Sequence, residues 1–131
     1  MNVTTAQAHT GSHSLTFHIW STQNGDNGVV KVPLCWNSSG SQTNVSNFSF
    51  YMKTVDVVGV FPSLGSYTAY LWDCAGNQVA GVPLGPTNGA WVLVTASPFA
   101  TTAACYLTLN FGFGDAYQGD VYIDDVKFTS P

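Results

Sequence analysis

Hydrophobic and polar residues alternate along most of this chain, which is the pattern of β-strands with one buried face. It marks residues 15–20, 48–53, 67–73, 106–113 and 119–128, and the apolar segments 29–36, 79–84 and 91–96 bring the predicted strands to eight. Segments rich in Gly, Asn, Ser, Thr and Pro separate them, and these residues favour turns. Short strands in such an arrangement predict an all-β, two-sheet β-sandwich of the jelly-roll type.

Composition agrees with this fold and limits the classes of partner that we expect the chain to bind. The 131 residues, 45% of them hydrophobic, suit one domain that covers residues 1–131. Only 8% are charged, with no Arg and no Glu, and the formal net charge is −4. The chain has no basic cluster, so we expect neither a nucleic acid nor a membrane as partner. Its uncharged polar surface is typical of secreted proteins that handle polysaccharides, which predicts an extracellular location.

The alternation also sorts the aromatic residues, which make up 14% of the chain. In residues 67–73 one face holds Tyr67, Ala69 and Leu71, and we expect this face to be buried. The opposite face then holds Tyr70 and Trp72. Aromatic rings at i and i+2 of a strand form a platform about 7 Å long. Pyranose rings stack their C–H faces on such side chains, so this pair is the leading candidate for a sugar-binding site.

Other residues could complete that site. Asn110 and Thr108 would supply hydrogen bonds if their strand lies beside residues 67–73. Trp20 and Trp36 end predicted strands and could line a rim, and Tyr51 lies opposite the core phase of its own strand. The predicted ligand-binding residues are therefore Trp72, Tyr70, Trp20, Trp36, Tyr51 and Asn110. The low charge favours a neutral polysaccharide such as a β-glucan, xylan or mannan.

The remaining aromatic residues are assigned to the core where they share a strand face with aliphatic residues. These are Phe17, Phe48, Phe50, Phe111 and Phe113.

Catalysis is not predicted from these residues. A glycosidase needs two carboxyl groups across a cleft, one of them protonated, and the chain has no Glu. Asp124 and Asp125 are adjacent in a predicted strand, so their side chains should point to opposite faces. The other aspartates lie in or beside predicted turns, where capping is their ordinary role. We therefore expect no enzyme activity and name no catalytic residue.

Three cysteines, Cys35, Cys74 and Cys105, have no zinc-like spacing. One disulfide with one free thiol is the simplest interpretation, and three buried thiols are the alternative. Cys35 and Cys74 each end a predicted strand, and this shared position favours a bond between them. Cys105 begins a predicted strand and could pair with either of them if their strands are neighbours. The sequence leaves the pairing open.

Four segments, taken in order, resemble carbohydrate-binding modules of families four, nine, sixteen and twenty-two. They are AHTGSHSL at 8–15, FSFYMK at 48–53, GAWVLV at 89–94 and VYIDDV at 121–126. The resemblance implies a sandwich fold and a non-catalytic domain that binds polysaccharide. It also implies that the module targets a secreted glycoside hydrolase whose catalytic domain belongs to the same parent chain. An adhesive or assembly domain of a secreted or cell-surface protein is the alternative.

The resemblance further implies a structural calcium ion. Its ligands would be Asp124 and backbone carbonyls of the segment from Gly11 to His13, since calcium takes several oxygen ligands. The chain departs from the family because the usual first strand with its acidic ligand is missing. Either that strand is shortened or Asn2 to Ala6 replace it in part, and a missing strand would leave an open edge for a partner. In the alternative interpretation, Asp124 caps backbone amides at a bulge.

Overall fold

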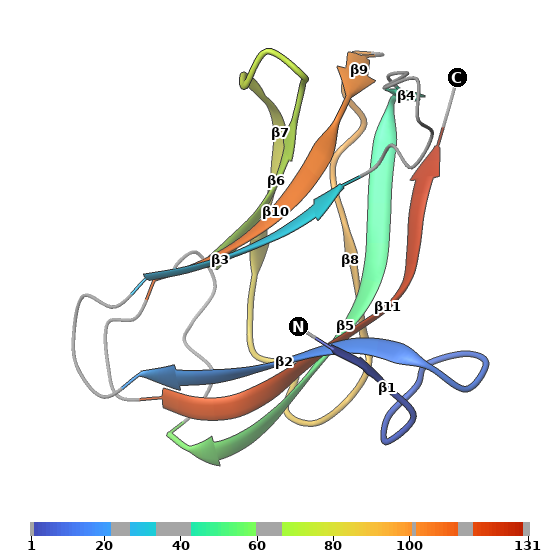
Figure 1. Ribbon diagram of the computed structural model, residues 1–131. Helices are drawn as coiled ribbons and strands as arrows, with labels where there is room; N and C mark the ends of the chain where they lie inside the picture. The colour runs from blue at the N-terminus through green and yellow to red at the C-terminus, as the bar shows by residue number, and fades with distance from the viewer. Residues whose placement is uncertain are drawn as a thin grey trace.

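The computed structural model of the chain describes residues 2–21, 27–33, 43–59, 67–100, 102–112 and 117–129. These residues form an all-β fold in which two antiparallel sheets face one another (Figure 1). The prediction of a two-sheet β-sandwich is therefore confirmed. In the described part of the chain, no helix is long and apolar enough to cross a bilayer.

The first sheet has the strand order β1-β2-β11-β5-β8. Its strands are β1 (Asn2–Thr4), β2 (Ser14–Ser21), β11 (Tyr117–Thr129), β5 (Asn47–Val58) and β8 (Val92–Thr95). The second sheet has the order β3-β10-β6-β7. Its strands are β3 (Asn27–Pro33), β10 (Tyr106–Gly112), β6 (Tyr67–Trp72) and β7 (Gln78–Leu84). A separate pair consists of β4 (Thr43–Val45) and β9 (Thr102–Ala104).

The core lies between the two sheets, where the alternating apolar residues of both sheets meet. In β6, Tyr67, Ala69 and Leu71 are fully buried, as the alternation predicts. The largest buried side chains of the first sheet include Phe48, Phe50, Met52 and Val121. Phe17 is also buried, whereas the side chains of Phe111 and Phe113 lie outside the described residues.

Three short strands were not predicted. β1 pairs with β2 through Asn2 opposite Thr16 and Thr4 opposite Ser14. Residues 2–4 thus cover the edge of the first sheet, in agreement with a short segment replacing the usual first strand in part. β4 and β9 pair at one end of the sandwich. Each of these strands has three residues, too few for a period of two to be recognised.

Candidate functional site

Three aromatic side chains gather on the second sheet, on the face turned away from the core. Trp72 of β6 lies directly opposite Tyr106 of β10. Their rings are nearly parallel, with centroids 6.0 Å apart and an interplanar angle of 13°. Tyr70 meets Trp72 edge to face, with centroids 6.1 Å apart. We call Tyr70, Trp72 and Tyr106 the aromatic platform; all three are half-buried.

A buried hydroxyl holds the centre of this platform. The indole Nε1 of Trp72 donates a hydrogen bond of 2.8 Å to Oγ1 of Thr108. Thr108 lies opposite Tyr70 in the sheet and is buried. Because the indole N–H is satisfied from beneath, the position of the Trp72 ring is fixed before any ligand arrives. Such preorganisation lowers the entropy cost of binding.

Asn110 lies next along β10, opposite Thr68. The condition on which Thr108 and Asn110 were named is met, because β10 pairs with β6. The side-chain Oδ1 of Asn110 is buried and has no hydrogen-bond partner among the described residues. A buried acceptor without a donor is uncommon in native proteins. A contact between Asn110 and a ligand stays a prediction.

A glycine makes room for Tyr70. A Cβ atom built at Gly81 of β7 would lie 2.9 Å from both Cδ1 and Cε1 of the Tyr70 ring. Gly81 is the register partner of Tyr70, so the ring lies across the backbone of the neighbouring strand. Only a residue without a side chain permits this close approach. Gly81 thereby sets the orientation of the outer ring of the aromatic platform.

A cation borders the aromatic platform on its other side. Lys31 of β3 pairs with Thr108, and its Nζ lies 3.8 Å from the centroid of the Tyr106 ring. This is cation–π geometry. Neither Lys31 nor Tyr106 was among the predicted site residues. The alternation contains the signal, because buried Leu107 and Leu109 place Tyr106 on the same face as Thr108.

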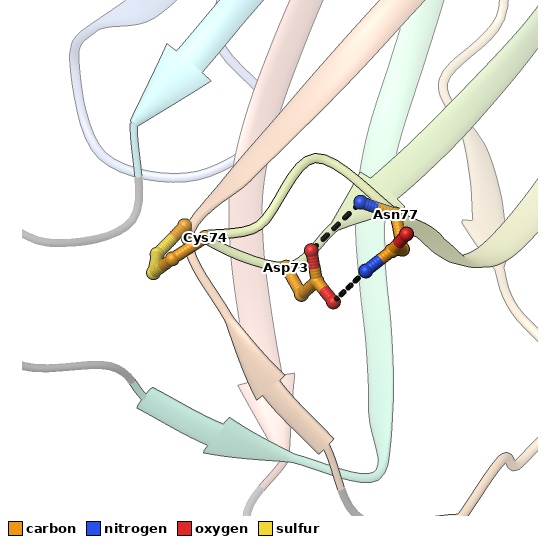
Figure 2. Close-up of a disulfide and its surroundings, with 4 residues drawn as sticks. Asp73, Cys74 and Asn77 are labelled. Carbon is orange, nitrogen blue, oxygen red and sulfur yellow. Dashed lines mark hydrogen bonds between the residues drawn. A yellow bond between two sulfur atoms is a disulfide. The ribbon is translucent and has the colours of Figure 1, made fainter.

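A disulfide joins the two strands that carry the stacked rings. Cys74 is bonded to Cys105, with Cα atoms 5.1 Å apart (Figure 2). The N–H of Cys105 also donates a hydrogen bond of 2.8 Å to the carbonyl of Trp72. This is one of the pairings that the sequence left open, and Cys35 lies outside the described residues. The disulfide thus fixes the strand ends at which Trp72 and Tyr106 meet.

The turn after Cys74 is closed by Asp73. Its Oδ1 accepts a bond of 2.7 Å from the backbone N–H of Asn77, and its Oδ2 accepts one of 2.9 Å from Asn77 Nδ2 (Figure 2). These hydrogen bonds, the side-chain one first, lower the pKa of the Asp73 carboxyl below its ordinary value. The expected role of Asp73 as a turn-capping residue is confirmed.

The structure does not bring all the predicted ligand-binding residues together. Trp20 and Tyr51 belong to β2 and β5 of the first sheet, whereas the aromatic platform belongs to the second. Tyr51 stacks on the imidazole of His9, with centroids 3.6 Å apart. A single site made of all these residues is therefore wrong, because alternation gives the face of a strand but not its sheet. Trp36 lies outside the described residues.

The expected separation of Asp124 and Asp125 is also wrong. The register of β11 against β5 shifts between Asp124 and Lys127, and Asp125 has a left-handed backbone with φ 49°. This bulge breaks the period of two. Both carboxylates consequently bond the segment His9–Thr10. Oδ2 of Asp125 lies 2.7 Å from His9 Nδ1, and Oδ1 accepts a bond from the Thr10 hydroxyl. These contacts, that of Thr10 first, lower the pKa of Asp125.

Asp124 accepts hydrogen bonds from backbone amides. Its Oδ2 accepts from the N–H of His9 at 2.8 Å and of Thr10 at 3.2 Å, and its Oδ1 accepts from the N–H of Asp125 at 2.7 Å. This is the capping arrangement of the alternative interpretation. Calcium requires oxygen ligands around it. In this arrangement N–H donors face both carboxylate oxygens of Asp124.

Gly11 and His13 are the other two residues of the predicted metal site. Gly11 occupies a turn with φ 66°, and His13 is exposed, with Nδ1 2.7 Å from the Ser12 hydroxyl. Among the described residues, no group of three or more His, Cys, Asp or Glu side chains is placed to hold a metal ion. Calcium binding at Asp124, Gly11 and His13 stays a prediction.

Comparisons with known proteins support the architecture. No protein-family model and no curated protein matches the sequence. Nine chains of solved structures match the fold. One is a glycoside hydrolase family 43 arabinoxylan arabinofuranohydrolase from Bacillus subtilis in complex with cellotetraose. It superposes with a TM-score of 0.52 at 18% identity, over 98% of this chain and 24% of that one. The likeness shows a shared β-sandwich, and this chain spans about a quarter of the matched protein.

Proposed function

We propose that this chain is a non-catalytic carbohydrate-binding module. It binds a neutral plant-type polysaccharide, a β-glucan, xylan or mannan, on the aromatic platform. The observation that carries this proposal is the pair formed by Trp72 and Tyr106, whose nearly parallel rings lie on the solvent side of a rigid sheet. Aromatic rings in this setting take the apolar faces of sugar rings, and adjacent polar groups bond the hydroxyls.

The surroundings of the aromatic platform suit such a ligand. Thr108 holds the indole of Trp72, and Gly81 lets Tyr70 lie flat against β7. Asn110 lies two residues after Thr108 on β10, opposite Thr68. Lys31 adds ammonium donors over the Tyr106 ring. None of these groups forms the pair of carboxyl groups that glycoside hydrolysis requires, which supports binding rather than turnover.

The proposal extends to the setting of the domain. The chain covers about a quarter of a matched glycoside hydrolase. Its motifs also resemble those of carbohydrate-binding modules. Both observations support a module that is attached to a catalytic domain. We propose a secreted parent protein, in which this domain brings the enzyme to its polysaccharide. The disulfide Cys74–Cys105 supports that location, since disulfides persist in oxidising compartments.

Affinity electrophoresis on soluble β-glucan, xylan and glucomannan, followed by titration calorimetry on those that retard the protein, tests this function. We expect Trp72→Ala to weaken binding at least tenfold, because it removes the central ring. Trp72→Phe should fall between it and the wild type, because it keeps a ring but loses the bond to Thr108. Leu93→Ala is the matched control, since Leu93 is 50% exposed on the first sheet. Failure to bind any of the polysaccharides, or unchanged affinity of Trp72→Ala, would overturn the proposal.

A further inference from the structure

A second aromatic surface lies on the opposite side of the molecule. Trp20 of β2 is 72% exposed, whereas its strand neighbour Ile19 is buried in the core. The indole therefore faces solvent from the outer side of the first sheet, whereas the aromatic platform lies on the outer side of the second sheet. The two sheets face one another across the core (Figure 1). An exposed indole leaves a large apolar surface in water, an unfavourable state that a ligand would relieve.

The side chains beside Trp20 are arranged in a row across three strands. Gln118 of β11 lies directly opposite Trp20, and Val58 of β5 lies opposite Gln118. Residues paired in this way share one face, with Cβ atoms about 5 Å apart. Val58 is 51% exposed. The row thus presents an indole and an aliphatic side chain with a carboxamide between them.

A chain of hydrogen bonds orients that carboxamide. His18 Nδ1 lies 2.8 Å from Oδ1 of Asp120, and His18 Nε2 lies 3.4 Å from Nε2 of Gln118. With the proton on Nδ1, His18 donates a hydrogen bond to the Asp120 carboxylate, and its Nε2 accepts one from the amide of Gln118. We assign this Nδ1–H tautomer of His18 from the hydrogen-bond network. The carboxamide then has one N–H directed to His18. Its Oε1 and its second N–H are the acceptor and donor for a neighbouring ligand.

We propose that Trp20, Gln118 and His18 form a second saccharide-binding site, separate from the aromatic platform. A pyranose ring stacks on the indole of Trp20, and two of its hydroxyls bond the carboxamide of Gln118. His18 and Asp120 position that carboxamide without touching the sugar. The ligand class, a neutral saccharide, rests on the proposed function.

Two sites on opposite sheets have a consequence for polymers. Packed sheets are separated by about 10 Å, and both sites face outward, so two ligand chains would lie on opposite sides of the domain. One domain can then bridge two polysaccharide chains. Bridging on a multivalent polymer raises the overall avidity without any new contact.

Calorimetry with a short oligosaccharide of the bound polysaccharide tests this inference in four proteins: the wild type, Trp20→Ala, Trp72→Ala and the double variant. We expect two ligands per wild-type protein, one for each single variant and none for the double variant. Gln118→Leu, close to Gln118 in volume, should weaken the Trp20 site at least fivefold in the Trp72→Ala background. Light scattering with the polymer should show cross-linking by the wild type only. Val57→Ala, an exposed apolar change near the site, is the control for folding.

The outcomes separate the two proposals. One ligand per wild-type protein, lost in Trp72→Ala and kept in Trp20→Ala, would overturn the second site and leave the proposed function intact. One ligand that is lost in Trp20→Ala and kept in Trp72→Ala would instead support the Trp20 site and overturn the aromatic platform. Lack of binding to any saccharide would overturn both.

Discussion

Removing the Cys74–Cys105 disulfide should lower both the stability of the domain and the affinity of the aromatic platform. The two cysteines are 31 residues apart in sequence. In the chain-entropy description, closing a loop of that length disfavours the unfolded state by about 3.7 kcal/mol. A variant with both cysteines changed to Ala should lose roughly that amount of unfolding free energy. Changing both avoids leaving a free thiol at the end of β6.

Urea denaturation followed by tryptophan fluorescence measures the loss. With a slope of about 2 kcal/mol/M, a loss of that size moves the midpoint down by nearly 2 M. The wild type treated with reductant should approach the variant, and the variant should not respond to reductant. A midpoint that is unchanged in the double variant would refute the stabilising role of the disulfide.

The effect on binding follows from where the disulfide lies. Cys74 is two residues after Trp72, and Cys105 directly precedes Tyr106, so the bond fixes the strand ends that carry the stacked rings. We expect the double variant, measured in buffer where it stays folded, to bind polysaccharide a few times more weakly than the wild type. Equal affinity would mean that the hydrogen bond from Cys105 to the Trp72 carbonyl holds the rings without the disulfide.

Two further predictions concern Gly81 and Asp124. Gly81→Ala should displace the Tyr70 ring and weaken polysaccharide binding about threefold to tenfold, with little change in melting temperature. In a Tyr70→Ala background the same change should have no effect on affinity. Additive losses of affinity in the double variant would contradict the contact between Gly81 and Tyr70. From the amide-capped geometry we expect Asp124→Ala to lower the unfolding free energy by about 1 kcal/mol, since it removes the acceptor of the half-buried His9 and Asp125 amides and of the exposed Thr10 amide. Calorimetric melts with and without a chelator should then coincide, while a melt lowered by the chelator would establish the calcium ion that the family resemblance implies.

Much of the fold could be predicted because a strand's buried face is a local property. The alternation through residues 67–72 was enough to place Leu71 in the core and Trp72 outside it, and the structure shows this arrangement. The same reasoning applied to β10 correctly places Thr108 and Asn110 on the outer face of the strand. It would also have identified Tyr106, whose position one residue before Leu107 places it on the outer face.

The choice of sheet could not be predicted in the same way. Trp20 and Tyr51 are on outward faces, as their alternation indicates, but their strands pair with β11 rather than with β10. Strand pairing depends on contacts between residues far apart in the chain. A period of two within one strand carries no information about those contacts. The bulge at Asp125 has a related cause. Its left-handed backbone interrupts the period within one strand, and no Gly or Asn marks the position.

The two aromatic surfaces therefore differ in how firmly the fold prepares them. Around Trp72, a hydrogen bond to Thr108, a stacked partner in Tyr106 and the nearby disulfide hold the rings in place. Around Trp20, the indole has no described ring partner, and the order lies in the polar chain from Asp120 through His18 to Gln118. A preorganised surface loses less entropy on binding than a mobile one. The aromatic platform should accordingly be the tighter of the two sites for a short oligosaccharide.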